Sequence, residues 1–414
     1  MKQIQELLKE RKQRGFELAK ATKITEKNGV WQVPSATSLN KVYQVELMLE
    51  GAKCTCEDYK ERGIKCKHYF AVQYVLTKTT NIDGTTTITQ TKRITYPQNW
   101  KAYDLATEQQ KELYQKLLND LCNTIQEKPY TFGRPKMPMR DMVFASALKV
   151  YSTFSLRRFG TDKKEAVAKG YLAKAPDYST VAKYMESEEM TPILKDLLQI
   201  SALPLKAVEN DSFSIDSSGF SPHKFSRWFD HKWGAKGKEV DKKLFYKVHI
   251  VVGNKTHIIC NAEVTTQFVS DYVMLPQLVQ EVKQNFNVTE LDADKAYSGR
   301  PNFDLLEKLG IVPMIPFKSD ATPNPRGHSH IWRDMYNYFT YNREAFLMRY
   351  HQRSNVETAF FMVKSKFSDY VRSKTDTACI NEILLKLISH NICVVIQETF
   401  ELGIQANFTR GENC

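Results

Sequence analysis

The spacing of apolar residues divides the chain into segments that predict different kinds of structure. Residues 1–50 begin with a charged, helix-like stretch and continue with alternating apolar and polar positions at 30–33 and 43–47, the period of half-buried strands. Residues 100–205 carry Leu, Tyr and Ala at helical spacing, with a basic break at residues 133–136. A small sheet is therefore expected first, and a chiefly helical region after it.

Beyond Pro204 the pattern changes to strands and helices in alternation. Strands are predicted at about residues 213–216, 245–252, 257–260, 288–292 and 312–316, and helices at about 271–282 and 303–309. This order predicts an α/β fold, in which a mixed sheet has antiparallel strands first and parallel strands later, with flanking helices. The expected divisions are an N-terminal region at 1–78, a Thr-rich linker or hairpin at 79–99, a helical region at 100–205, an α/β domain at 206–400 and a tail at 401–414.

Composition and charge narrow the class of protein. The 414 residues are 42% hydrophobic and 26% charged, which is typical of a soluble globular protein of two or three domains. Lys and Arg exceed Asp and Glu by 12, which predicts attraction to a polyanion. The sequence shows no apolar run of about 18 residues, and its N-terminal stretch is amphipathic and charged rather than a signal peptide. A cytoplasmic nucleic-acid partner is therefore favoured over a membrane.

Three of the eight cysteines are clustered with a histidine. Cys54, Cys56, Cys66 and His68 have the form C-x-C-x9-C-x-H, and two close ligand pairs joined by a short arm suit tetrahedral zinc. The alternative to a metal site is three buried cysteines beside a surface histidine, but packing does not explain the paired spacing. The pattern resembles the SWIM zinc finger at all four positions, which implies a structural Zn²⁺ in a small α+β module at about residues 46–78. The scattered cysteines are expected to be reduced and buried.

Two aspartates end predicted strands. Asp216 follows a short alternating run and is expected where the strand gives way to a turn, and Asp294 closes a second run in the same manner. If the two strands are parallel neighbours, both carboxylates emerge at one edge of the sheet, where their oxygens can bind divalent cations. Alone, an aspartate after a strand is more often a turn or helix cap.

A helix beginning near Tyr350 supplies a third carboxylate. On this helix Arg353, Glu357 and Lys364 fall within roughly 40° of one another, and Tyr350 lies at the edge of that face. A carboxylate flanked by cations suits metal binding by Glu357 and phosphate contacts by Arg353 and Lys364. Taken alone, a pair such as Arg353 and Glu357 is more often a solvated i,i+4 salt bridge.

Together these blocks resemble the DDE insertion-sequence transposases of IS4 or IS5 type, over about residues 130–400. The Y-x2-R-x3-E-x6-K signature of that family is met by Tyr350, Arg353, Glu357 and Lys364, with Asp216 in "IDSSGF" and Asp294 in "DADKAYSG". The resemblance implies an RNase H-like core, Mg²⁺ or Mn²⁺ held by Asp216, Asp294 and Glu357, and DNA contacts from Tyr350, Arg353 and Lys364. It also implies double-stranded DNA ends as the partner, action as a homodimer, and a bacterial, nucleoid-associated location.

Two features depart from that family. Its members do not generally carry a SWIM finger, and only 62 residues separate Asp294 from Glu357, so any insertion there is small. A catalytically idle DNA-binding regulator that uses the zinc module is the alternative function, and a nuclease without strand transfer is a third. Residues 217–247 hold eight Lys or Arg against three Asp or Glu with interleaved aromatic residues, which suits either unpaired DNA or a solvated loop.

Overall fold

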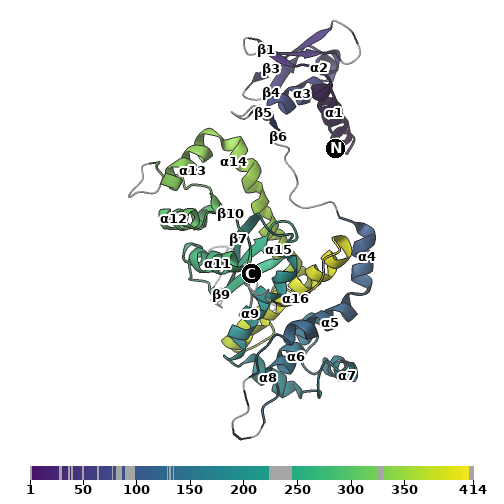
Figure 1. The fold of residues 1–414 in the computed structure, drawn as a ribbon, viewed down its shortest axis with the longest axis vertical. Coiled ribbons are helices and arrows are strands. Elements are labelled where there is room, and N and C mark those ends of the chain that lie inside the picture. The colour runs from purple at the N-terminus through teal and green to yellow at the C-terminus, as the bar shows by residue number, and fades with distance from the viewer. Residues whose placement is uncertain are drawn as a thin grey trace, which may run out of the picture. The chain divides into compact units, whose positions relative to one another are not determined.

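The structure is a computed structural model of the 414-residue chain. It describes residues 2–27, 30–35, 38, 41–48, 51–62, 65–76, 78–80, 86–88, 98–127, 129, 132–133, 135–222, 245–323 and 330–409. The chain forms two compact units, residues 1–92 and residues 93–414, which can be followed by colour in Figure 1.

The first unit is a four-stranded antiparallel sheet with helices packed against it. Its strands follow the order β1-β2-β3-β4, and β2 pairs with β3 from Val30 opposite Glu46 to Pro34 opposite Val42. Val33 and Val45 are fully buried, so the predicted alternation does place one face of the sheet in a core. The elements are α1 (Lys2–Ala21), β1 (Thr25–Lys27), β2 (Val30–Pro34), β3 (Val42–Met48), β4 (Gly51–Cys54), α2 (Glu57–Arg62) and α3 (Lys67–Leu76), followed by the hairpin strands β5 (Lys78–Thr80) and β6 (Thr86–Ile88).

The second unit begins with helices, as the spacing of apolar residues predicts. Tyr114, Leu118 and Leu121 are buried along one face of α5, and the same core continues into the sheet that follows. The helices are α4 (Trp100–Glu108), α5 (Gln110–Cys122), α6 (Met139–Tyr151), α7 (Gly160–Ala168), α8 (Tyr178–Met185) and α9 (Met190–Ala202), with a short 3-10 turn, η1 (Leu203–Leu205).

The centre of the second unit is a five-stranded mixed sheet in the order β11-β10-β7-β8-β9. β8 is antiparallel to both of its neighbours, whereas β10 is parallel to β7 and to β11. This confirms the predicted α/β class, and the strand order is that of an RNase H-like core. The strands are β7 (Ser212–Phe220), β8 (Tyr246–Gly253), β9 (Ile259–Thr266), β10 (Glu290–Ala293) and β11 (Val312–Met314).

The two faces of this sheet carry different helices. His249 on β8 faces Asp271 at the start of α11, whereas Ser214 on β7 donates a hydrogen bond to the Gln352 carbonyl of η3. Thus α11 covers one face, and η3 with α15 covers the other. The remaining elements are α11 (Asp271–Asn285), η2 (Lys295–Tyr297), α12 (Arg300–Lys308), α13 (His330–Tyr341), α14 (Arg343–Tyr350), η3 (His351–Arg353), α15 (Ser354–Phe367) and α16 (Asp376–Glu401).

The last helix, α16, is a core element. By length and composition it is apolar enough to cross a membrane, but 94% of its apolar window is buried in the protein. Its polar residues are satisfied inside the fold, as where Asn391 accepts a hydrogen bond from the Ile259 backbone and donates one back to it. Packing against α9, α6 and α4 therefore accounts for the apolar composition of α16.

Candidate active site and zinc site

Asp216 does not lie where the sequence pattern places it. It is the fifth of the nine residues of β7 and pairs with Ile250 of β8, so the strand continues past it to Phe220. The expectation that Asp216 ends a strand is therefore wrong, because the antiparallel partner β8 extends the ladder on one side. On the other side the parallel partner β10 stops at Ala293, opposite Ile215. Asp216 is thus the first residue of β7 that β10 leaves uncovered.

Asp294 follows directly from that register. Because Ala293 pairs with Ile215, Asp294 and Asp216 are the next residues of two adjacent parallel strands. The neighbouring acid, Asp292, lies deeper on the same face, fully buried, where it accepts a hydrogen bond from Asn254 (3.0 Å) and has the Ser212 hydroxyl oxygen 3.3 Å away. Burial raises the pKa of Asp292 well above its usual range, and its carboxyl is engaged inside the fold by Asn254.

The segment η3–α15 lies along β7 and supplies the remaining groups of the site. Arg353 donates a hydrogen bond to Asp216 (Nη1 to Oδ2, 3.2 Å) and a second to the Glu357 carboxylate. Further along α15, Lys364 donates to the hydroxyl of Ser218 at 2.7 Å. Asp216 and Ser218 point to the same face of β7, so the continuous segment η3–α15 contacts both side chains. Phe361, on the same helix, is exposed rather than packed.

Negative charge is concentrated around Asp216. Burial, together with the charges of Asp294 and Glu357, raises its pKa to about 6, against the opposing effects of the Ser217 amide and Arg353. Burial also lowers the pKa of Lys364 to about 8. These shifts place Asp294 and Glu357 within electrostatic reach of Asp216. Among the described residues, however, the carboxylates of Asp216, Asp294 and Glu357 do not form a cluster of close potential metal ligands.

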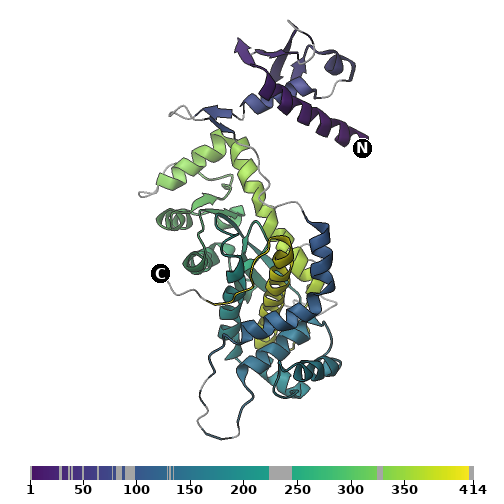
Figure 2. The same ribbon diagram turned by 45° about the vertical axis from the view of Figure 1, so that its right-hand side comes forward.

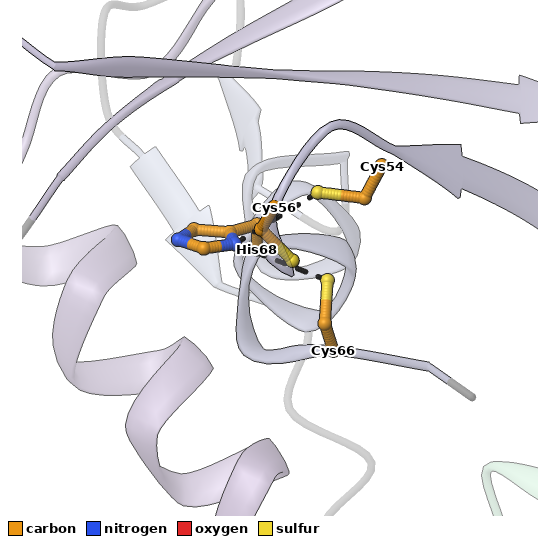
Figure 3. Close-up of side chains that lie close together, drawn as sticks. All are labelled: Cys54, Cys56, Cys66 and His68. Atoms are coloured by element: carbon orange, nitrogen blue, oxygen red, sulfur yellow. Dashed lines mark hydrogen bonds between the residues drawn. The ribbon is translucent and has the colours of Figure 1, made fainter. Parts of the chain in front are cut away.

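The four ligands expected to bind zinc do form such a group. The donor atoms of Cys54, Cys56, Cys66 and His68 all lie within 4.8 Å of one another and are buried (Figure 3). His68 Nδ1 is 3.8 Å from the Cys54 sulfur and 3.9 Å from the Cys66 sulfur. A tetrahedral zinc ion with Zn–S bonds of about 2.3 Å separates its ligand atoms by roughly 3.5–3.8 Å, so the observed spacing matches zinc.

The surroundings of this group favour a thiolate at Cys66. The pKa of Cys54 is raised by its hydrogen bond to Cys66 and by burial, and burial raises the pKa of Cys56. A hydrogen bond from Cys54, together with one from His68, lowers the pKa of Cys66 to about 3, although burial acts in the opposite direction. The Tyr59 amide donates to the Cys56 sulfur at 3.4 Å. The ring of His68 stacks on Tyr43, with centroids 4.3 Å apart, which fixes the orientation of the imidazole.

Comparison with known families identifies both parts of the chain. Residues 43–72 match the SWIM zinc finger, and residues 210–392 match the transposase DDE domain. Residues 210–392, called the DDE domain below, are therefore similar to a transposase DDE domain. The matched range of this DDE domain includes Asp216, Asp294, Glu357, Tyr350, Arg353 and Lys364, and the SWIM match contains all four zinc ligands.

Helix α1 lies outside the SWIM match but is part of the same folded unit. Its buried Arg11 donates one hydrogen bond to Asp58 on α2 and another to the Lys65 carbonyl at 3.3 Å. Asp58 follows the second zinc ligand by two residues, and Lys65 directly precedes the third. Arg11 therefore joins the two arms that carry the ligand pairs. A Cβ on Gly15 would lie 2.7 Å from the Lys67 carbonyl, so α1 packs too closely on α3 to allow one.

The DDE domain has a cavity beside Asp294. It has a volume of about 880 Å³ and combines the aromatic rings of Phe317, Tyr336 and Phe339 with cationic side chains. Lys295, Lys318 and Arg343 supply those charges, and the Arg343 guanidinium lies 4.8 Å from the centre of the Phe339 ring. The cavity lining thus combines these cations and aromatic rings with the carboxylates of Asp294 and Asp320.

Sequence reasoning missed a buried polar cluster that positions η3. Ser212 donates to the side-chain oxygen of Gln352 at 2.8 Å, and Asn254 donates to Ser212 at 2.7 Å. Gln352 directly precedes Arg353, so this cluster fixes the turn that aims Arg353 at Asp216. The serines alternate with apolar residues along β7, but a buried polar stripe and a solvated strand face have the same sequence pattern.

Tyr297 is a second residue that the sequence analysis did not single out. It is fully buried three residues after Asp294, and its hydroxyl has no hydrogen-bond partner among the described residues. Burial, followed by the charges of Asp271 and Asp216, raises its pKa well above the usual value. The phenol is therefore a neutral donor at the edge of the carboxylate group. The basic and aromatic segment at 217–247 lies largely outside the described residues, which omit 223–244.

Proposed function

We propose that this protein is a DNA transposase of IS4 or IS5 type that cleaves and joins DNA strands at the inverted-repeat ends of an insertion sequence. The observation that carries the proposal is the contact of Arg353 with two of the three signature acids, because this guanidinium hydrogen-bonds both Asp216 and Glu357. Asp216 and Asp294 each follow the last paired residue of two adjacent parallel strands, Ile215 and Ala293. Acids brought together at the edge of a sheet are suited to phosphodiester chemistry.

The donor set fits divalent magnesium or manganese. Asp216, Asp294 and Glu357 offer hard carboxylate oxygens. Burial, and after it the charges of Asp294 and Glu357, raises the pKa of Asp216, and a dication would neutralise the charge of these acids. In this proposal Asp216 would hold both ions, and Asp294 and Glu357 would each complete one site. When bound, such ions supply activation of the attacking oxygen and stabilisation of the leaving oxygen.

The cations on η3 and α15 have a separate role in the proposal. Arg353 presents a planar guanidinium beside Asp216, and Lys364 presents an ammonium beside Ser218. Both can bind the phosphates on either side of the scissile bond and hold the strand in line with the acids. Tyr350, whose ring centre is 5.9 Å from the Arg353 guanidinium, supports that side chain and can contact the DNA backbone.

The partner and assembly follow from the same chemistry. A net charge of +12 suits double-stranded DNA, and cleavage at two ends of an element calls for two active sites, so we propose a homodimer on DNA. The helices at residues 100–205 are the region proposed to bind the ends. In the SWIM finger, four protein ligands close the zinc coordination, so this zinc has a structural role.

The decisive experiment is metal-dependent cleavage by the full chain. Purified protein with Mg²⁺ or Mn²⁺ should nick or cut a duplex carrying the inverted repeats that flank its gene. Asp216→Asn, Asp294→Asn and Glu357→Gln should each lower the rate by at least about a thousandfold while DNA binding remains. Asp104→Asn, an exposed acid on α4, serves as the matched control and should retain the full rate.

Two outcomes would contradict the proposal in different ways. Cleavage that persists in any one of the three carboxylate variants would remove that residue from the site. Specific binding of the wild-type chain to the ends, without cleavage in either metal, would favour the DNA-binding regulator instead.

A further inference from the structure

We propose that α7 and α8 form a DNA-reading surface, with α8 entering the major groove of a duplex at the element's ends. This inference rests on the proposed function and specifies which part of the helical region meets the DNA. The surface, called here the α7–α8 surface, consists of the exposed side chains Arg157, Arg158, Lys164, Lys174, Tyr178, Ser179 and Lys183.

Charge is segregated on this surface. Residues 152–183 contain seven Lys or Arg and three Asp or Glu. Each acid is already engaged within the protein: Asp162 lies 3.5 Å from Lys111, Glu165 lies 2.8 Å from Lys169, and Asp177 caps α8. By contrast, four exposed cations form no ion pair with any described residue, and these are Arg158, Lys164, Lys174 and Lys183.

Internal contacts fix α7 relative to α8. Lys163 on α7 is buried and donates to the Pro176 carbonyl at 2.7 Å, directly before the cap of α8. The Arg157 guanidinium lies 5.3 Å from the centre of the Tyr178 ring, which joins the preceding loop to the first turn of α8. The connection between the helices, residues 169–177, is longer than the turn of a helix-turn-helix motif. These contacts therefore hold the two helices in a fixed orientation, as a short turn does in that motif.

The exposed face of α8 is suited to reading bases. Val181 and Met185 are buried, which leaves Ser179 and Lys183 on the outward stripe at i,i+4 spacing. Tyr178 is 42% exposed at the start of the helix. The Ser179 hydroxyl donates to the Asp177 carboxylate at 2.6 Å and can still accept a hydrogen bond from a base, and the Lys183 ammonium can reach base edges and phosphates in the major groove. Acidic residues at 186, 188 and 189 follow the helix, so DNA is favoured along α8 up to Lys183 in its last turn and not beyond.

The α7–α8 surface lies away from the proposed catalytic acids. Within the second unit, α7 and α8 occupy one end and α13 and α14 the opposite end, with the sheet between them (Figures 1 and 2). Sequence recognition and cleavage would therefore involve different segments of the DNA. It follows that recognition by this surface should not require the divalent ions of the active site.

The test is DNA binding by the full chain without added divalent ions, over a series of salt concentrations. The probes are a duplex of the flanking inverted repeat, a scrambled duplex of equal composition and a duplex RNA of the same repeat. Replacing Arg158, Lys164 and Lys174 together by Ala should weaken binding to both DNA duplexes and reduce the slope of log K against log salt by about 3. The pair Ser179→Ala with Lys183→Ala should instead lower the preference for the repeat by about tenfold or more.

A matched variant controls for loss of charge in general. Lys116, Lys206 and Lys308 are exposed cations of the same unit without ion pairs to described residues, and their triple Ala variant should bind as the wild type does. Equal losses in the control and the test variant would overturn the inference, as would equal affinity for the duplex RNA, whose narrow major groove excludes a helix. If these variants bind normally while the wild type cleaves DNA, the inference fails and the proposed function stands. A wild-type chain that binds no duplex contradicts both.

Discussion

Arg353 donates a hydrogen bond to Asp216 across 3.2 Å, from a turn 137 residues further along the chain. The same guanidinium also donates to Glu357, so one cation joins two of the three signature acids. Arg353 lies in η3, Glu357 on α15 and Asp216 on β7. The i,i+4 pair of Arg353 and Glu357 is therefore also bonded to a strand of the sheet. This long-range contact distinguishes the site from an ordinary surface salt bridge.

The ionisation of Asp216 should make stability depend on pH. Burial, together with Asp294 and Glu357, raises its folded pKa to about 6, above the value of about 3.9 in an unfolded chain. The stability that the protonated carboxyl contributes is therefore fully present below about pH 4 and is lost as pH rises through about 6. Asp216→Asn should be more stable than the wild type at pH 7.5 by roughly 1–3 kcal/mol, and the difference should disappear near pH 4.

Urea unfolding without added divalent ions, repeated at several pH values, measures this difference. Asp104→Asn replaces an exposed aspartate on α4 and should show no such pH dependence. If Asp216→Asn is less stable than the wild type at pH 7.5, the carboxylate is stabilised in the fold and the charge argument is wrong.

Zinc should hold the first unit together, with Arg11 positioning its ligands. The purified chain should contain about one zinc per molecule, and Cys66→Ser should lose it while Cys379→Ala, a core cysteine of the second unit, should not. Arg11→Ala should weaken zinc affinity by roughly tenfold to a hundredfold in a chelator competition, because it frees the two ligand arms.

The exposed Arg14 on the same helix is the matched control for Arg11, because its contact with Glu10 is a surface pair at 3.6 Å. Arg14→Ala should retain the wild-type zinc affinity. A folded wild-type first unit without metal would refute the zinc assignment, and an Arg11→Ala variant with unchanged affinity would refute the positioning role.

Glu382 on α16 should be among the most important charged residues for stability. It is buried and accepts hydrogen bonds from the Arg372 amide (3.1 Å) and the Ser373 hydroxyl (2.7 Å), with the Lys149 ammonium 3.8 Å away. Glu382→Ala should lower the free energy of unfolding by about 3–5 kcal/mol, because it leaves a buried cation uncompensated.

Denaturant unfolding measures that loss, and Lys149→Met in the same background tests its cause. The second change should recover part of the stability, because it removes the unpaired cation. Exposed Glu307→Ala on α12 should change stability by no more than about 0.5 kcal/mol. No recovery in the double variant would show that the loss comes from the hydrogen bonds to residues 372 and 373 rather than from the charge.

Much of the architecture could be predicted from local pattern. The helix at 271–282 is found at Asp271–Asn285, and the strand at 245–252 is found at Tyr246–Gly253. The placement of Asp216 at a strand end was wrong because β7 is lengthened by its partner β8, a pairing between segments distant in the chain. Asp292 is buried because η3 packs over this part of the sheet, and that packing cannot be read from the sequence. The burial leaves Asp294 as the candidate ligand.

The sequence by itself determined the zinc ligands and the order of the elements. Closely spaced cysteine and histidine donors, and the periods of strands and helices, are local properties that neighbouring residues encode. Only the tertiary structure decided that Arg353 reaches Asp216 and that Arg11 of α1 joins the two arms that carry the zinc ligands. It also decided that four exposed cations around α7 and α8 form no ion pair with a described residue, whereas the nearby acids are engaged. These relationships depend on which distant surfaces pack together, and packing is settled by burial across the whole chain rather than by any local pattern.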